Sequence, residues 1–106
     1  MVDIVKNARK RHKHVEVEVE NQRDAILATN SGATIVMLDN FSPEQIKKTI
    51  TALQKKKLRN KVKLEASGGI NSKNITAYAK TGVDMISVGS ITNSVSGIDL
   101  SLEVYV

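Results

Sequence analysis

Cysteine is absent from the 106 residues of this chain. A chain without cysteine has no disulfide framework, no iron–sulfur cluster, no thiolate zinc site and no thiol nucleophile. Aromatic residues make up only 3% of the chain, so few rings are present to stack on nucleic-acid bases. No apolar run approaches the roughly 18 residues of a membrane span, and the N-terminal MVDIVKNARKRHKH lacks the apolar core of a signal peptide. We therefore expect a cytoplasmic protein with no membrane partner.

What the sequence does contain is typical of one folded domain. Hydrophobic residues form 41% of the chain and charged residues 25%, as in ordinary soluble folds. A chain of 106 residues is long enough for a single core. It is too short for a closed eight-unit α/β barrel, which needs about 200 residues or more. The net charge of +5 favours an anionic ligand without specifying which one.

Short strand-like runs alternate with segments of helical spacing along the whole chain. Strands are predicted at 15–20, 34–38, 62–66 and 85–88, and helices at 2–11, 22–29 and 43–55. A further helix is predicted between a cap at Asn71 or Ser72 and Gly82, and the tail 98–106 forms one more strand or a packing arm. Ser42, Pro43 and Gln45 have the spacing of a capping box with proline at the first helical position. Strands and helices that alternate over short connections indicate parallel βα units, in an open α/β sheet or in part of a barrel.

A row of glutamates runs along the first predicted strand. Glu16, Glu18 and Glu20 alternate with valines and therefore share one face of that strand. The interior of a barrel would solvate or pair these carboxylates at its C-terminal mouth, and Asp39 reaches the same mouth from the next strand. Two carboxylates on neighbouring strand ends suit a hard cation such as Mg²⁺, bound together with substrate phosphates. A half-solvated edge strand, and a turn or cap role for Asp39, explain the same pattern without a ligand.

Two glycine-containing sequences follow the third and fourth predicted strands. They are Ser67-Gly68-Gly69 and Val88-Gly89-Ser90. We predict that each lies at a strand-to-helix turn, where backbone N–H groups and a helix N-terminus bind an anion. Barrels often bind phosphate with the loops after their last two strands, so the pair of loops predicts a phosphate site. Glycine also occurs at such turns for steric reasons, so neither loop predicts the site alone.

The densest basic stretch comprises Lys55, Lys56, Lys57, Arg59, Lys61 and Lys63. Such a stretch is able to contact nucleic acid, but cations at a helix C-terminus also complement the helix dipole. With so few aromatic residues we expect no nucleic-acid partner. His12 and His14 have cationic neighbours, which disfavours metal binding, and we expect both at the surface. The sequence has no HExxH or Walker motif and no evident Ser/His/Asp triad.

Five motifs, taken in order, resemble the C-terminal part of the quinolinate phosphoribosyltransferase family. They are EVEVEN (16–21), IVMLDNFSPE (35–44), LEASGGI (64–70), AYAKTGVD (77–84) and ISVGSIT (86–92). The resemblance implies part of an incomplete TIM-like α/β barrel, with residues 1–106 as its C-terminal portion. The family's N-terminal domain and early barrel strands would then be absent from these residues.

The resemblance also implies an activity and a set of site residues. Members of the family are pentosyltransferases of pyridine nucleotide and NAD biosynthesis. They transfer phosphoribosyl from phosphoribosyl pyrophosphate (PRPP) to quinolinate with Mg²⁺, giving nicotinate mononucleotide, pyrophosphate and CO₂. Glu18 and Asp39 match the acidic residues near the ribose and the metal-bound PRPP. Ser67, Gly68 and Gly69, and Val88, Gly89 and Ser90, match the loops that hold the phosphate.

The sequence departs from the family pattern at two points. Thr92-Asn93-Ser94 stands where the family usually has Thr-His-Ser, so a role for that histidine does not carry over. The basic residues with which the family clamps the two carboxylates of quinolinate have no counterpart here. We therefore expect the isolated chain to lack catalysis, and we expect it to self-associate as a dimer or higher homo-oligomer.

Two other interpretations fit the same residues. A stand-alone phosphate-binding or interaction module would keep the barrel loops without catalysis. A relative that acts on another pyridine, or on a molybdenum-pathway substrate, is compatible with the missing carboxylate clamp.

Overall fold

The computed structural model describes residues 2–88, 91–94 and 100–102. Its sheet contains four parallel strands, β1 (Glu16–Val19), β2 (Ile35–Asp39), β3 (Lys63–Ser67) and β4 (Met85–Val88). Two antiparallel strands, β5 (Ile91–Ser94) and β6 (Leu100–Leu102), extend it beyond β4. The strands lie in the sheet in their sequence order. The predicted parallel βα units are thus confirmed.

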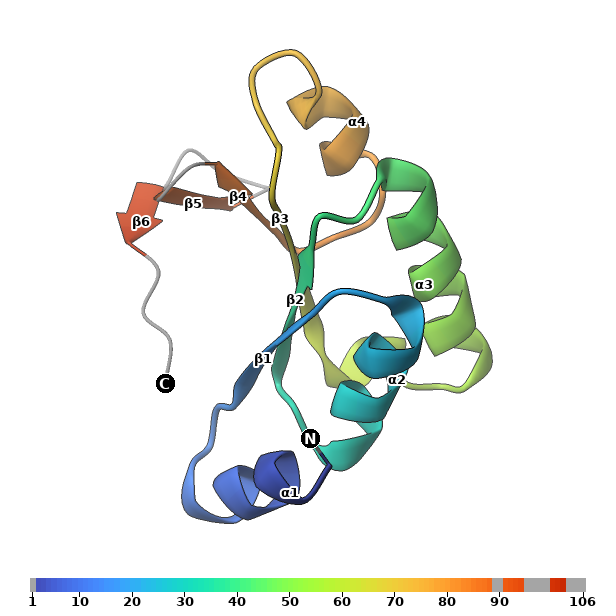
Figure 1. Ribbon diagram of the computed structural model, residues 1–106, viewed down its shortest axis with the longest axis vertical. Helices are drawn as coiled ribbons and strands as arrows, with labels where there is room; N and C mark the ends of the chain where they lie inside the picture. The colour runs from blue at the N-terminus through green and yellow to red at the C-terminus, as the bar shows by residue number, and fades with distance from the viewer. Residues whose placement is uncertain (1, 89–90, 95–99, 103–106) are drawn as a thin grey trace.

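In the described part of the chain, one α-helix precedes β1, and three α-helices and a 3₁₀ turn connect the parallel strands. They are α1 (Val2–Arg11), α2 (Gln22–Ser31), α3 (Pro43–Lys55), η1 (Arg59–Lys61) and α4 (Ile75–Ala79). Helices α2, α3 and α4 lie on the same side of the sheet (Figure 1). Among the described helices, none has the length and apolar character needed to span a membrane.

The core lies between these helices and one face of the sheet. Val36 and Leu38 of β2 and Leu64 and Ala66 of β3 are completely buried there. Because side chains alternate along a strand, Glu18 and the residues level with it belong to the other face, which points away from the helices and is here called the open face. The register aligns them across the sheet in the row Glu18, Met37, Glu65 and Met85. Val17 and Val19 pack with the core on the helix side, so the alternation that the sequence predicts for this strand is confirmed.

Capping residues define where α2 and α3 begin and end. Asn21 accepts a hydrogen bond from the Asp24 N–H at 2.8 Å, and Gly32 closes α2 with a left-handed φ of 113°. Ser42 accepts from the Gln45 N–H at 3.1 Å while the Gln45 side chain accepts from the Ser42 N–H at 2.8 Å. This reciprocal pair is the capping box that the sequence predicts.

Two predicted elements differ in the structure. Helix α4 begins at Ile75, later than the cap predicted at Asn71 or Ser72, and residues 72–74 form turns. Asn71 nevertheless has the hydrogen bonds of an N-cap, because its side chain accepts from the N–H groups of Lys73 and Asn74 and its carbonyl accepts from the Ile75 N–H at 2.9 Å. The prediction that a helix follows Val88-Gly89-Ser90 is wrong, because the next element is strand β5, which pairs antiparallel with β4. Strand β6 lies within the tail for which the sequence predicts a strand or a packing arm.

Candidate carboxylate and glycine-loop site

Polar side chains end three neighbouring strands at one edge of the sheet. Glu18 is the penultimate residue of β1, and Asp39 and Ser67 are the last residues of β2 and β3. Since these strands are parallel, their C-terminal ends meet at the same edge. Asp39 is level with Ser67 in the register, and the Ser67 hydroxyl donates a hydrogen bond of 3.3 Å to Asp39 Oδ1. The structure therefore brings together the carboxylates and the serine that the sequence predicts.

Glu18 and Asp39, here called the carboxylate pair, interact directly. The pKa of Glu18 is raised above its ordinary value, first by a side-chain hydrogen bond with Asp39. Loss of some hydrating water beside the protein, and the negative charges of Asp39 and Glu20, raise this pKa further. Each of two neighbouring carboxyl groups disfavours the negative charge of the other. The same arrangement favours a cation, which neutralises both groups.

The glycine loop, residues 67–69, follows β3 at this edge. Gly68 and Gly69 have φ values of +87° and +69°, a region that L side chains rarely adopt. A Cβ added at Gly69 would meet no atom within 4 Å, so the backbone there borders open space. Successive backbone N–H groups in such a turn form a concave anion site, and a ligand is able to approach them closely. The loop thus has room for a phosphate, and the phosphate site stays a prediction.

The second predicted loop is only partly described. Gly89 and Ser90 lie outside the described residues. Val88 packs its half-buried side chain against the core, so that side chain does not reach the carboxylate pair. Because a strand follows this loop, the argument from a helix N-terminus does not apply to it.

The donor atoms at this edge restrict which cation would fit. Among the described residues, no group of three or more His, Cys, Asp or Glu side chains is placed to hold a metal ion. Two carboxylates and a serine hydroxyl are hard oxygen donors, which match Mg²⁺ and not a soft metal. Mg²⁺ is commonly held by one or two carboxylates together with substrate phosphates, so this donor set fits that mode of binding.

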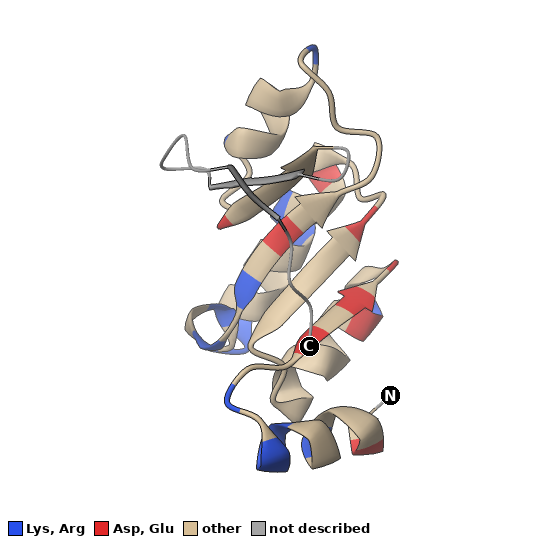
Figure 2. Cartoon of the chain, turned by 90° about the vertical axis from the view of Figure 1, so that its left-hand side faces the viewer, with Lys and Arg blue, Asp and Glu red and all other residues tan. Residues whose placement is uncertain are grey.

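Positive charge gathers at the opposite end of the sheet. In Figure 2 acidic residues lie along the strands of the open face and at the start of α1, while Lys and Arg segments cluster where the strands begin and toward the end of α1. A cavity of about 390 Å³ lies at that end. We call it the basic cavity, and it is lined by Arg9, Lys13, His14, Thr34, Ile35, Asn60, Lys61, Val62 and Lys63. The sequence does not predict it, because its lining comes from segments far apart along the chain.

One residue of the site was missed by the sequence analysis. Asn40, directly after Asp39, has a positive φ of 59° and lies against Gly68. The only sequence signal is an asparagine after a strand, since asparagine tolerates the left-handed region better than most residues.

Parallel βα units with helices on one face, and with carboxylates and a glycine loop at the strand C-termini, define an α/β protein of the TIM-barrel type. Residues 1–103 match the family described as quinolinate phosphoribosyl transferase, C-terminal domain. The chain belongs to this family.

Individual relatives agree with this assignment. The chain is 54% identical over 92 residues to a probable carboxylating nicotinate-nucleotide pyrophosphorylase of Methanothermobacter thermautotrophicus, and these residues are 87% of this chain and 33% of that protein. It is 38% identical over 91 residues to the human nicotinate-nucleotide pyrophosphorylase, covering 86% of this chain and 30% of the human one. The solved nicotinate-nucleotide pyrophosphorylase of Francisella tularensis superposes with a TM-score of 0.72 at 46% identity, covering 96% of this chain and 36% of that one. The chain spans about a third of the length of these relatives.

Proposed function

We propose that this chain forms the PRPP-binding part of a carboxylating nicotinate-nucleotide pyrophosphorylase. The complete reaction transfers phosphoribosyl from PRPP to quinolinate and releases pyrophosphate and CO₂, giving nicotinate mononucleotide for NAD biosynthesis. One observation carries the proposal, namely the continuous contact from Ser67 through Asp39 to Glu18 at the strand C-termini. This contact joins the glycine loop to a carboxylate pair, as a ligand with both a phosphate and a reactive ribose requires.

The carboxylate pair suits the charge that develops on the ribose. Phosphoribosyl transfer passes through a ribose with oxocarbenium character, which is positive, and fixed carboxylates beside it stabilise that charge. Asp39 is held in place by the Ser67 hydroxyl, so it does not need to reorganise as the charge develops. Glu18 is exposed on the open face of the sheet, where ligand and solvent reach it.

The glycine loop suits the 5′-phosphate of PRPP. The backbone beside Gly69 borders open space, so a phosphate is able to approach the N–H groups of the loop closely. Asn74 Nδ2 donates to the Gly69 carbonyl at 2.9 Å, which fixes the loop from its far side. A fixed loop binds phosphate without an additional cost of ordering its backbone.

Mg²⁺ would be held by Glu18 and Asp39 together with the pyrophosphate group of PRPP. When bound, it would offset the negative charge of the leaving pyrophosphate. A cation bound there would favour the charged form of Glu18, against the groups that raise its pKa.

The acceptor carboxylates need positive charge from other residues. Arg9, Lys13, Lys61 and Lys63 surround the basic cavity, at the end of the sheet opposite to Asp39. They are therefore too distant to bind the carboxylates of a quinolinate that lies beside the ribose. We infer that residues other than these four bind the carboxylates of quinolinate. We also infer that the 106-residue chain binds PRPP without catalysing the reaction.

The exposed edge of the sheet favours association with another chain. Among the described strands, β1 pairs only with β2, so one of its edges faces away from the sheet. An unpaired strand edge offers N–H and C=O groups to another chain. We propose that the chain self-associates through this edge, and sedimentation at several concentrations measures it.

Isothermal titration of the chain with PRPP, with and without Mg²⁺, tests the proposed function. Binding should need Mg²⁺, should weaken about tenfold or more in Asp39→Asn and Glu18→Gln, and should be lost in Ser67→Asp, where a new negative charge faces the phosphate. Glu44→Gln on α3 removes one carboxylate elsewhere and serves as the matched control. Equal binding by the parent chain, Asp39→Asn and Ser67→Asp would refute the proposal. If the chain binds inorganic phosphate, and neither Mg²⁺ nor the Asp39→Asn substitution changes that binding, the result would favour a simple phosphate-binding module.

A further inference from the structure

Asn40 has an unusual backbone conformation at the end of β2. Its φ is 59°, and among the described residues only Lys57 shares a positive φ without being glycine. Residues with a Cβ seldom occupy this region, although asparagine does so more readily than most. Asn40 directly follows Asp39, so this turn lies one residue from the carboxylate pair.

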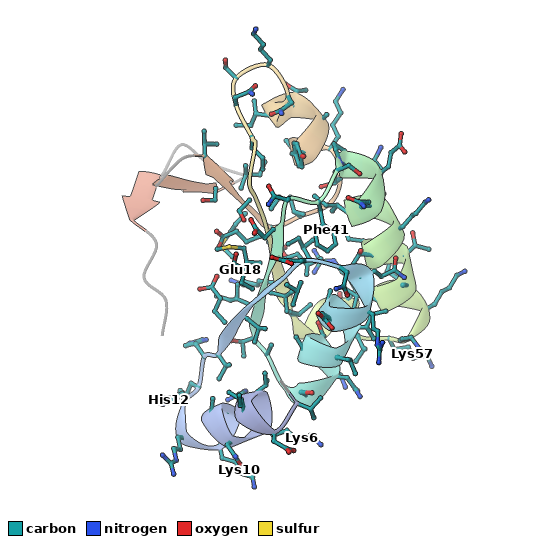
Figure 3. All side chains as sticks on the ribbon, viewed as in Figure 1. Lys6, Lys10, His12, Glu18, Phe41 and Lys57 are labelled. Atoms are coloured by element: carbon teal, nitrogen blue, oxygen red, sulfur yellow. The ribbon has the colours of Figure 1, made fainter. Side chains whose placement is uncertain are left out.

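The turn sends two side chains to opposite faces of the sheet. In an extended strand, residues two positions apart point to the same side. Asp39 follows this rule with Met37 on the open face, but Phe41 is 2% exposed and belongs to the core on the helix side. Figure 3 shows Glu18 and Phe41 on either side of the sheet. The left-handed residue between Asp39 and Phe41 breaks the alternation and allows both placements.

Contacts on both sides fix this turn. The Asn40 N–H donates to the Ser67 carbonyl at 2.9 Å, which continues the pairing of β2 with β3 by one residue. The Phe41 carbonyl accepts a buried hydrogen bond of 2.8 Å from the Tyr78 hydroxyl of α4. The chain on either side of Asp39 and Asn40 is therefore tied to β3 and to α4.

The Asn40 side chain also lies directly against the glycine loop. A Cβ built on Gly68 would be 2.3 Å from Asn40 Oδ1 and 2.9 Å from the Asn40 backbone nitrogen. No real Cβ contact is that short, so the loop and Asn40 pack together only because residue 68 lacks a side chain. The position of the loop and the position of Asp39 thus depend on one residue.

We propose that Asn40 is a positioning residue that, through its left-handed backbone and its contact with Gly68, sets Asp39 and the glycine loop in register with each other. Asn40 acts through Asp39 and does not itself need to touch the substrate. Its importance for PRPP binding rests on the proposed function, whereas its effect on Asp39 does not.

A set of substitutions separates backbone conformation from side-chain contact. Asn40→Gly keeps access to positive φ, whereas Asn40→Val carries a β-branched side chain that strongly disfavours it. Gly68→Ala forces a methyl group toward Asn40 Oδ1, and the double variant Asn40→Gly/Gly68→Ala removes that side chain while the backbone contact remains. Thermal unfolding and the dispersion of the NMR spectrum show that each variant is folded.

Two measurements at constant pH report whether Asp39 and the glycine loop keep their positions. The first is NMR of the unliganded chain, with the exchange rate of the residue-40 amide and the side-chain carboxyl ¹³C shift of Asp39. The second is Mg²⁺-dependent affinity for PRPP. Asn40→Gly should retain amide protection, the Asp39 shift and affinity within about threefold of the parent. Asn40→Val and Gly68→Ala should each expose the residue-40 amide to exchange, move the Asp39 signal and weaken binding about tenfold. The double variant should bind more tightly than Gly68→Ala alone, because the side chain that the new methyl group meets is gone.

The two readouts also separate the two proposals. A parent chain that does not bind PRPP refutes the proposed function, and the NMR comparison still tests the role of Asn40. The role of Asn40 is refuted if Asn40→Val leaves the residue-40 amide and the Asp39 signal as in the parent. It is equally refuted if the folded Asn40→Gly variant loses both as completely as Asn40→Val does.

Discussion

The carboxyl groups of Glu18 on β1 and Asp39 on β2 face each other at the C-terminal edge of the sheet, close enough for Asp39 to raise the pKa of Glu18. Period-two alternation places Glu18 on the open face, and the end of β2 places Asp39 beside it. Two carboxyl groups repel each other when both are ionised, which lowers the stability of the fold. The same two groups together are able to hold a cation.

The first prediction concerns the dependence of stability on pH. The pKa of Glu18 is raised in the folded chain, so folding favours its protonated form. The resulting contribution of Glu18 to the free energy of unfolding is complete below the ordinary pKa of glutamate, and it is lost as the pH rises through the raised pKa. Glu18→Gln imitates the protonated state, so it should raise the melting temperature at mildly alkaline pH and leave it nearly unchanged in acid.

A matched variant on the same strand face controls for the loss of a carboxylate. The charge of Glu20 is the last and smallest of the causes that raise the pKa of Glu18. Glu20→Gln should therefore change the melting temperature less than Glu18→Gln at alkaline pH. A Glu18→Gln variant that is less stable than the parent at every pH would contradict this account of the pair.

The second prediction concerns Arg59 at the opposite end of β3. Its guanidinium donates to the carbonyls of Val62 and Gly82, each at 2.9 Å, and to Asp84 Oδ2 at 3.0 Å. Asp84 Oδ2 also accepts from the Leu64 N–H at 2.8 Å, so one ion pair joins the starts of β3 and β4. Arg59→Ala should lower the free energy of unfolding by roughly 2 kcal/mol, because several hydrogen bonds to a charged group are lost together.

Urea unfolding measures this loss, and the neighbouring Lys61 supplies the control. Lys61 is exposed and also basic, so Lys61→Ala should change the free energy of unfolding by less than about 0.5 kcal/mol. If the two alanine variants unfold at the same urea concentration, the hydrogen bonds of Arg59 do not hold the strands together.

The third prediction concerns the start of α3. Ser42→Ala removes one half of the capping box and should destabilise the chain by about 1 kcal/mol. Thr51→Ala on the same helix removes a hydroxyl that bonds only to the Lys47 carbonyl, and alanine has the higher helix propensity. Thermal unfolding should place Ser42→Ala below the parent and Thr51→Ala at or above it. The reverse order would show that the cap contributes nothing.

Much of the fold is encoded in local patterns of the sequence. The alternation of Val17 and Val19 with glutamates, the apolar run of β2 and the spacing after Ser42 each specify a local structure without reference to distant residues. The carboxylate pair was predictable for a similar reason. Parallel strands bring their C-terminal ends to one edge of the sheet. The two-residue alternation along β1 and the position of Asp39 at the end of β2 were therefore enough to predict that Glu18 and Asp39 lie together.

The features that the sequence did not predict depend on tertiary contacts. The left-handed turn at Asn40 is held by Ser67 and Gly68, which are distant in the chain. The strand after β4 pairs back on β4 itself, although the glycine pattern indicated a helix. In each of these cases local propensity permits more than one structure, and contacts elsewhere in the molecule decide between them.

The most direct test of the account is to map where PRPP with Mg²⁺ binds on the chain. Amide shifts of the ¹⁵N-labelled protein distinguish the two ends of the sheet, because a polyanion also has an electrostatic reason to bind the basic cavity. The account predicts that the largest shifts fall at Glu18, Asp39 and residues 67–69 and that they depend on Mg²⁺. If the largest shifts instead surround the basic cavity and persist without Mg²⁺, then the carboxylate pair and the glycine loop do not form the PRPP site.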